Sequence, residues 1–152
     1  MDSQNNKEEP KLFTFTVPGK PQGKARARTF YNSRSDKMSS VTPEKTVLYE
    51  NLIKTCFQQK YGQKRFSDDA YVVANILAYF EPPKSISKKR AEMLEGKIWP
   101  AKKPDSDNIA KVVLDALNGI AYHDDTQIIK LSVTKAYKEE AYLSVTLMRF
   151  DT

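Results

Sequence analysis

The sequence predicts a small single domain of the α+β class, in which helices flank a mixed or antiparallel β-sheet. Three observations point to this class. The chain has 152 residues, a usual length for one domain with its own core. Apolar segments of β type alternate with segments of helical periodicity, and the last two β-type segments follow one another closely. We expect the domain to occupy residues 11–152, after a disordered polar tail of residues 1–10.

The first half of the predicted domain contains a strand, a loop and a helix. Residues 11–17 alternate apolar and polar side chains, which is typical of a strand. Proline and glycine then recur, so residues 18–37 are expected to form a loop. Thr42 and Pro43 suit the N-cap and the first position of a helix that runs to about Tyr61. The apolar stripe of this helix is expected to be Val47, Leu48, Leu52, Ile53, Cys56 and Phe57.

The second half contains three β-type segments and two helices. The nearly continuous apolar run of residues 70–80 predicts a central strand that is buried on both faces. Residues 86–95 fit a short charged helix, and residues 106–118 give the clearest helical periodicity. Residues 126–137 and 141–150 are expected to pair as a hairpin. The buried face of the 106–118 helix is expected to comprise Ile109, Val112, Val113, Ala116, Leu117 and Ile120.

The composition excludes several classes of protein. No apolar run approaches the roughly 20 residues that span a bilayer, and the polar amino terminus does not resemble a secretory signal. We therefore expect a cytoplasmic protein without a membrane partner. The single cysteine, Cys56, rules out an internal disulfide framework and a cysteine-based zinc site.

Basic residues are concentrated in two segments. The chain has 25 Lys and Arg against 19 Asp and Glu, and residues 18–37 and 82–103 together hold 13 of these cations against three acidic residues. Such clusters are typical either of a protein that binds a polyanion or of a solvated surface. If the partner is DNA, the candidate phosphate ligands in the first segment are Lys20, Lys24, Arg26 and Arg28.

Aspartates gather around the 106–118 helix although the chain is basic overall. They are Asp105, Asp107, Asp115, Asp124 and Asp125. Each of them has an ordinary structural explanation: helix capping at the entry, ion pairs with Lys111 along the solvent face, or turn formation at the exit.

For the five aspartates taken together, a metal site is a better explanation than these separate structural roles. Asp105, Ser106 and Asp107 are three candidates for one cap, and Asp124 and Asp125 repel one another unless a cation is near. Carboxylates in this pattern suit a hard, oxygen-ligated ion such as Mg²⁺, whereas the calcium-loop pattern is not met.

Other roles around these aspartates remain open. The single histidine, His123, could be a ligand or a base, although a solvent-exposed turn residue is the more common case. Together with the basic loops, the aspartates indicate a metal-dependent nuclease, in which Lys111 could orient water or neutralise phosphate charge.

The stretch KPDSDNIAKVVLDALNGIAYHDDTQI closely resembles the signature of RusA-type Holliday junction resolvases, and FTFTVPGKPQGKARAR resembles the amino-terminal part of that family. The resemblance covers residues 12–150. It implies a RusA-like fold and a homodimeric, Mg²⁺-dependent endodeoxyribonuclease of bacteria, phages and prophages. Such an enzyme resolves four-way DNA junctions by paired symmetrical nicks in recombination and repair. We expect Mg²⁺ as the cofactor, with Mn²⁺ as a substitute.

The resemblance also assigns roles to individual residues. Asp105, Asp107 and Asp125 match the metal-binding and catalytic aspartates, Lys111 matches the lysine required for cleavage, and Asp124 is expected to assist in metal binding. The chain departs from some members at Pro104, where they carry a basic residue. Phosphate contact is therefore expected to shift to Lys102 or Lys103.

Other functions and arrangements remain open. The chain could be a non-catalytic protein that binds branched DNA, a nuclease for other branched DNA such as flaps, or a metal-dependent nucleotide hydrolase. The dimer interface could lie on residues 126–150 or on residues 43–61. Phe30 and Tyr31 could stack on bases at the branch point, although such aromatics more often pack in the protein.

Overall fold

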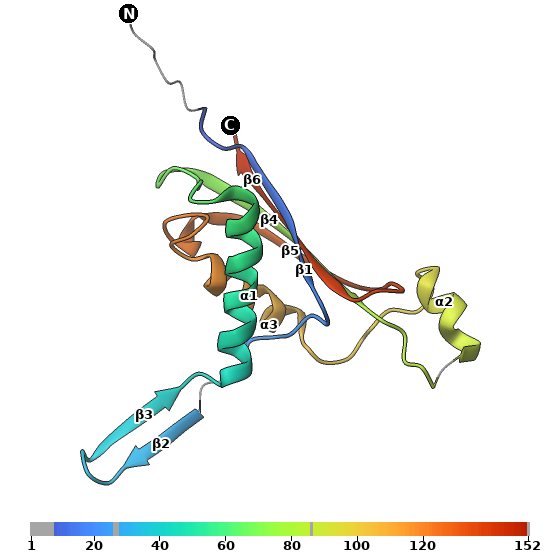
Figure 1. Ribbon diagram of the computed structural model, residues 1–152, viewed down its shortest axis with the longest axis horizontal. Coiled ribbons are helices and arrows are strands. Elements are labelled where there is room, and N and C mark those ends of the chain that lie inside the picture. The colour runs from blue at the N-terminus through green and yellow to red at the C-terminus, as the bar shows by residue number, and fades with distance from the viewer. Residues whose placement is uncertain (1–7, 26–27, 86, 152) are drawn as a thin grey trace, which may run out of the picture.

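The computed structural model describes residues 8–25, 28–85 and 87–151 and forms an α+β domain with a mixed sheet, as predicted (Figure 1). The main sheet has four strands in the order β1-β6-β4-β5, with β4 and β5 parallel and the other neighbours antiparallel. These strands are β1 (Leu12–Pro18), β4 (Tyr71–Phe80), β5 (Ile128–Tyr137) and β6 (Tyr142–Phe150).

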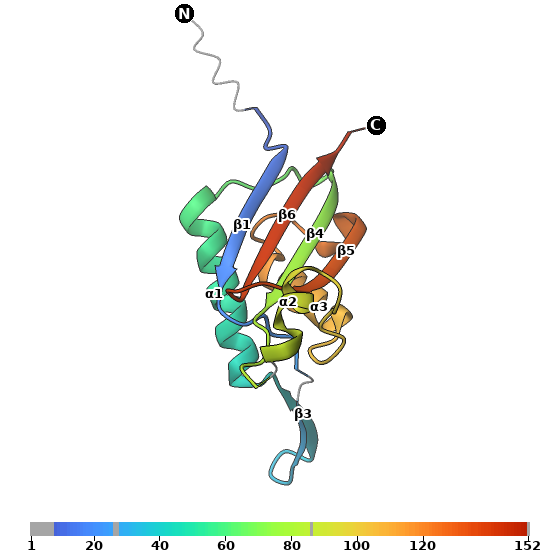
Figure 2. The same cartoon turned by 90° about the vertical axis from the view of Figure 1, so that its right-hand side faces the viewer.

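Two helices cover one face of this sheet. They are α1 (Glu44–Tyr61) and α3 (Ser106–Leu117), while the short α2 (Arg90–Leu94) lies near one end of the sheet on its opposite side (Figures 1 and 2). The core lies between the sheet and these two helices. In β1, for example, Phe13, Phe15 and Val17 are buried and the intervening residues are exposed, so the predicted alternation is confirmed. No described helix is long and apolar enough to cross a membrane.

The α3 helix confirms its predicted buried face. Its apolar positions recur every three or four residues and all point into the core, while Ile120 packs partly buried behind them. The helix ends at Leu117, and Gly119 adopts a φ of 74°, which glycine tolerates well. The fully or nearly fully buried side chains of α3 are Ile109, Ala110, Val112, Val113, Ala116 and Leu117.

The predicted hairpin of the last two strands is wrong. Strand β4 lies between β5 and β6, so residues 138–141 carry the chain across it instead of closing a hairpin. The amide of Lys138 donates to the carbonyl of Phe80 at 2.9 Å, which fixes this crossing at the end of β4. Central placement of β4 was predicted, but only one of its faces is fully buried, because α1 and α3 cover one side of the sheet and only the short α2 lies near one end of the other.

The first helix differs from the prediction in its N-cap residue and in the face that it buries. Pro43, whose ψ of 143° is not helical, occupies the N-cap position in place of Thr42. The helix buries Thr46, Tyr49, Ile53 and Phe57, because these residues lie on the face that meets β1 and α3. The predicted apolar stripe was therefore only partly right: Cys56 is half-buried, and Val47, Leu48 and Leu52 are exposed.

Residues 28–41, most of which were expected to be a loop, form a second, two-stranded sheet. Strands β2 (Arg28–Asn32) and β3 (Lys37–Val41) pair as a hairpin that projects from the body of the domain (Figure 1). Asp36 adopts a φ of 52° in the turn between them. Short strands with so many charged and polar residues lack the apolar alternation by which a strand is predicted.

Shorter segments agree with the prediction more closely. The charged helix near residues 86–95 is present as the turn η1 (Ser87–Lys89) followed by α2, and Ile86 lies outside the described residues. The turn η2 (Asp125–Gln127) precedes β5, which therefore begins slightly later than predicted. Residues 8–10 have no regular secondary structure, and residues 1–7 of the predicted tail lie outside the described part of the chain.

The corrected face of α1 predicts a difference in stability between two similar substitutions. We expect Ile53→Ala to lower the free energy of unfolding by about 2–5 kcal/mol, because it empties a fully buried site. Leu48→Ala is expected to change it by less than about 0.5 kcal/mol, because Leu48 is 60% exposed. Urea denaturation followed by circular dichroism measures both values. Equal losses would contradict the observed face of the helix.

Candidate functional site

The carboxylates of the two aspartates at the start of α3 have no hydrogen-bond or ion-pair partner among the described residues. Asp105 occupies the N-cap position, but its carboxylate accepts no capping hydrogen bond, and only its backbone carbonyl is used, by the amide of Ile109 at 3.0 Å. Asp107 lies in the first turn, is exposed, and makes no ion pair within residues 8–25, 28–85 and 87–151. Helix capping therefore does not account for the Asp105 carboxylate.

Further along the solvent face of α3, Asp115 is the centre of an ion-pair network. Its Oδ2 lies 3.6 Å from Lys111 Nζ and 3.2 Å from Lys24 Nζ, and Lys24 Nζ also lies 2.5 Å from Glu50 Oε1. Burial lowers the pKa of Lys24, but its hydrogen bonds to Glu50 and Asp115 outweigh burial and raise it overall. Lys24, expected to contact phosphate, is thus held between two carboxylates from α1 and α3.

The loop that carries Lys24 is fixed against α3 by its backbone as well. The Lys24 amide donates to the Asn108 carbonyl at 2.8 Å. A Cβ atom at Gly23 would lie 2.9 Å from the Cβ of Asn108 and 3.0 Å from that of Pro104, so only glycine allows this close approach. The amide of Ala25 donates to the Thr46 hydroxyl at 3.3 Å. Hydrogen bonds therefore hold this loop to the amino-terminal parts of both α1 and α3.

The adjacent aspartates after α3 have different environments. Asp124 caps η2: its carboxylate accepts a hydrogen bond from the Thr126 amide at 3.0 Å, and its own amide donates to Gln127 Oε1 at 3.1 Å. The Asp125 carboxylate is exposed, while its amide donates to Asn118 Oδ1 at 2.9 Å. Turn formation thus accounts for Asp124 and leaves Asp125 available.

The pKa values of this pair move in opposite directions. The Thr126 amide lowers the pKa of Asp124, with a further lowering from its hydrogen bond with Asp125. Partial burial raises the pKa of Asp125, and the hydrogen bond and negative charge of Asp124 raise it further. Asp115 adds to this rise and Lys111 opposes it, so Asp125 lies within electrostatic reach of the solvent face of α3.

The structure places the predicted acidic residues at two ends of one helix. With a rise of about 1.5 Å per residue, Asp105 and Asp115 are separated by roughly 15 Å along α3. Among the described residues, no three Asp, Glu, His or Cys side chains come close enough to share one metal ion. Lys111 lies between the two ends, one helical turn from Asp107 and one from Asp115. His123 is exposed in the exit turn.

The structure describes the side chains of four of the six residues that were predicted to bind DNA. Lys20 and Lys103 line a cavity that Asp105 borders, and Lys102 is exposed beside it in sequence. Arg26 lies outside the described residues, and Arg28 begins β2, with its side chain outside the described part.

Two residues without a predicted role hold the acidic segments in place. The Lys135 ammonium donates to the carbonyls of Lys102 at 2.5 Å and Pro104 at 3.0 Å, and so fixes the chain just before Asp105. The Gln127 amide nitrogen donates to the Ser67 and Ala70 carbonyls, each at 3.0 Å, and so fixes the turn of Asp124 and Asp125. Gln127 belongs to the aspartate-rich motif itself, which was the only sequence signal for its importance.

The ion-pair network predicts that Lys24 is structural, unlike its neighbour Lys20. We expect Lys24→Met to lower the free energy of unfolding by about 1–3 kcal/mol, because Glu50 and Asp115 lose their shared partner. Lys20→Met is the matched control, since Lys20 is exposed and should change stability by less than about 0.5 kcal/mol. Urea denaturation at pH 7 measures both, and a loss for Lys24→Met no larger than the control would contradict the network.

The raised pKa of Asp125 predicts a stabilising substitution. A carboxyl group with a raised folded-state pKa holds its proton more tightly when folded, so stability falls as the pH rises from its ordinary value of 3.8 through the raised value. In metal-free buffer at pH 7 we expect Asp125→Asn to melt at a higher temperature than the natural chain, and the difference to vanish below pH 3.8. Thermal melts over this range test it.

The contrasting substitution is Asp124→Ala, which removes the cap of η2 and should lower the melting temperature at pH 7. A lower melting temperature for Asp125→Asn in the same metal-free buffer would contradict the repulsion between the two carboxylates.

Comparison with known proteins identifies the family of this chain. A family model described as Endodeoxyribonuclease RusA matches residues 18–148, which include the basic loop, α3 and both acidic ends. The uncharacterized protein YqaN of Bacillus subtilis (strain 168) is 32% identical over 136 residues, covering 88% of this chain and 93% of the relative. The chain therefore belongs to the RusA family of endodeoxyribonucleases, the enzymes that resolve Holliday junctions.

Proposed function

We propose that this endodeoxyribonuclease is a Mg²⁺-dependent homodimer that resolves four-way junctions by paired symmetrical nicks. The observation that carries the proposal is the state of the Asp105 carboxylate. It stands at a helix start without capping the helix, next to the free Asp107 and beside a cavity lined by lysines. A carboxylate kept out of its usual structural role at such a place suits the binding of a metal ion at phosphate.

The available donors fit a divalent cation. Asp105, Asp107 and Asp125 offer exposed carboxylate oxygens, the hard ligands that Mg²⁺ and Mn²⁺ prefer, with assistance from Asp124 at the exit turn. Mg²⁺ needs only one or two carboxylates, since water completes its coordination, so a carboxylate pair is a sufficient donor set. The raised pKa of Asp125 is a second sign of fit, because a nearby cation would relieve the repulsion that causes it. When bound, the metal would supply an activated water and stabilise charge on the phosphate.

Lys111 is the proposed catalytic lysine. Its side chain is 62% exposed, while Asp115, at 3.6 Å from its ammonium, limits the directions in which it points. From this position the ammonium would donate to the attacking water or to a phosphate oxygen, where negative charge increases in the transition state. Asp115 therefore has a positioning role, and Lys24 completes its neutralisation.

Lysines around Asp105 would hold the DNA backbone. Lys20, Lys102 and Lys103 are exposed close to the start of α3, and Arg26 and Arg28, which follow the loop of Lys20 in sequence, are further proposed contacts. Most of the affinity of a protein for DNA comes from neutralised phosphates, so these contacts require no sequence preference.

A homodimer follows from the symmetry of the substrate. Two opposed cuts in a two-fold symmetric junction need two sites related by the same symmetry. Large apolar side chains are exposed at one end of the sheet face that α1 and α3 leave uncovered, and they support β6 and its neighbours as the interface. These side chains are Leu12, Tyr71, Met148 and Phe150. We place the activity in the bacterial cytoplasm, in the recombination and repair of phage or prophage DNA.

A cleavage assay tests the proposed reaction. A synthetic mobile four-way junction, a flap and a linear duplex are each incubated with the protein in Mg²⁺ or in EDTA. Paired nicks in the junction, dependent on Mg²⁺, are the expected result. Equal cutting of the flap would indicate a nuclease for branched DNA in general, and binding without nicking would indicate a non-catalytic DNA-binding protein.

Asp107→Asn tests the site assignment. We expect junction binding to survive, while the cleavage rate falls by about 10²–10³-fold or more, as for the loss of one group that acts in the transition state. Asp69→Asn is the control, since Asp69 is exposed in a turn outside the site. Cleavage by Asp107→Asn at the unaltered rate would show that the reaction does not use this carboxylate.

A further inference from the structure

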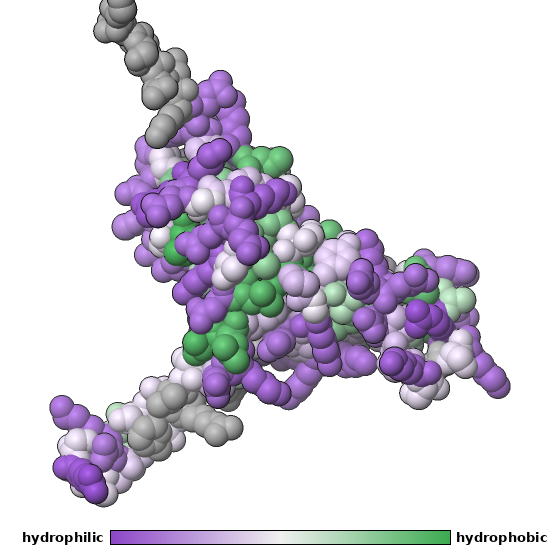
Figure 3. Space-filling view, viewed as in Figure 1, coloured by the Kyte–Doolittle hydropathy of each residue, from purple (hydrophilic) through white to green (hydrophobic). Residues whose placement is uncertain are grey.

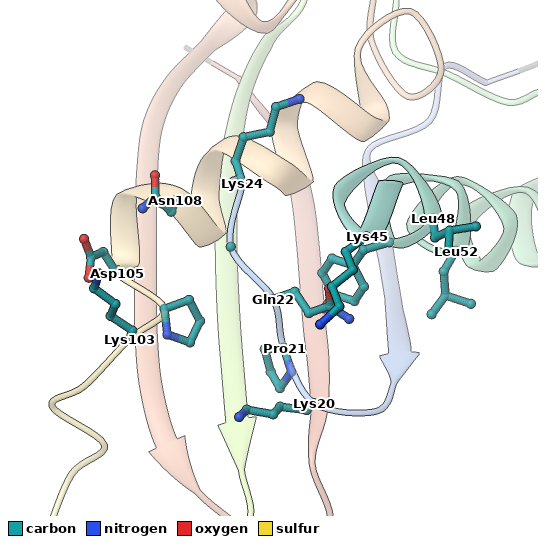
Figure 4. A pocket seen from close by; sticks show the side chains of 13 residues that line it. Lys20, Pro21, Gln22, Lys24, Lys45, Leu48, Leu52, Lys103, Asp105 and Asn108 are labelled. Atoms are coloured by element: carbon teal, nitrogen blue, oxygen red, sulfur yellow. The ribbon is translucent and has the colours of Figure 1, made fainter. Parts of the chain in front are cut away.

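A cavity of about 700 Å³ opens between the loop of residues 20–24, the first half of α1 and the start of α3 (Figure 4). Its volume is within the usual range of small-molecule sites. Asp105 and Asn108 form one side, so the cavity adjoins the proposed metal site. Apolar groups form much of the rest: Pro21, Leu48, Tyr49, Leu52 and Pro104.

The charges around this cavity favour an anion. Lys20 and Lys45 line it and make no ion pair with any residue that the structure describes, and Lys103 lies beside Asp105 (Figure 4). Lys24 extends away from the other lysines toward its two carboxylate partners. Asp105 is the only acidic residue in the lining. The ligand is therefore expected to carry phosphate near an apolar group.

Two of the apolar side chains in the lining are not needed for the core. Leu48 and Leu52 are 60% and 37% exposed, and hydrophobic surface is visible over the first half of α1 (Figure 3). The core uses a different face of this helix, that of Tyr49 and Ile53. Two leucines one turn apart, flanked by a lysine, offer an apolar surface beside a cation. Enzymes that hold an unstacked base place it against aromatic or apolar side chains, and lysines neutralise the flanking phosphates.

We propose that this cavity receives one unpaired nucleotide of the strand that is cut, at the branch point of the junction. Its base lies against Leu48 and Leu52, and its flanking phosphates lie at Lys20, Lys45 and Lys103. The inference rests on the proposed function, because the same strand must pass Asp105. It adds Lys45, Leu48 and Leu52 to the residues that contact substrate. The close approach at Gly23 keeps the loop wall of the cavity at a fixed distance from α3.

Fluorescence of 2-aminopurine tests this placement in the full-length protein. The base analogue is placed singly at each position around the branch point of a four-way junction, in EDTA so that nothing is cut. We expect binding to raise the fluorescence at one position, because the analogue leaves the base stack and enters the cavity. The double variant Leu48→Ala/Leu52→Ala should abolish the rise and weaken binding at least about 5-fold. Lys45→Gln should reduce the rise as well.

Matched controls lie on the same helix outside the cavity. Val47→Ala removes an apolar side chain that is 42% exposed, between Leu52 and Leu48 in exposure, and Lys54→Gln removes a cation; both should leave the rise unchanged. Thermal melts of each variant show that it folds.

Three outcomes would overturn the inference. Junction binding and cleavage without a rise at any position would overturn it and leave the proposed function standing. Failure of the natural chain to bind or cut the junction would overturn both. If light scattering shows a dimer for the natural chain and a monomer for Leu48→Ala/Leu52→Ala, these leucines contact a second copy of the chain instead of a nucleotide.

Discussion

Burial of one face of α3 in the core is the constraint on which the rest of the site depends. Ile109, Val112 and Val113 are completely buried, and each such side chain contributes about 1.5–3 kcal/mol relative to exposure. The helix therefore cannot rotate about its axis without exposing apolar surface. Asp107, Lys111 and Asp115 share the solvent face opposite, so their direction is fixed by residues that take no part in chemistry. The same burial keeps the entry and exit aspartates at a constant separation.

Some of the charged residues near the site stabilise the fold through ion pairs or capping, and others stay exposed. Of the two lysines in the short basic loop, Lys24 joins α1 to α3 through Glu50 and Asp115, whereas Lys20 stays exposed. Of the two adjacent aspartates, Asp124 caps a turn and Asp125 does not. In each case one member satisfies a neighbouring backbone group or charge, and its companion stays exposed to solvent. A count of charges along the chain therefore overestimates the number available for DNA or metal.

The sequence predicted what depends on local periodicity and missed what depends on distant contacts. The α3 face and the alternation in β1 repeat within a few residues, so they could be identified directly. The buried face of α1 depends on β1 and α3, and the order of β4, β5 and β6 depends on pairing across the whole domain. The aspartates and Lys111 lie in one continuous motif, so the sequence could single them out as site candidates. Their supports could not be singled out, because Lys24 and Glu50 are 26 residues apart and Gln127 and Ser67 are 60 apart.

The position of β6 has a consequence for the time at which the site forms. In the sheet, β6 separates β1 from β4, although it is the last of the described strands along the chain. The basic loop follows β1, and α3 follows β4, so within the sheet these two halves of the site are joined only through β6. A ribosome makes the chain from the amino terminus, and β6 emerges after every other element. In a growing chain, the basic loop and the aspartate-bearing helix α3 therefore follow strands that are not yet joined. Insertion of β6 between β1 and β4 is the step that unites them in one sheet.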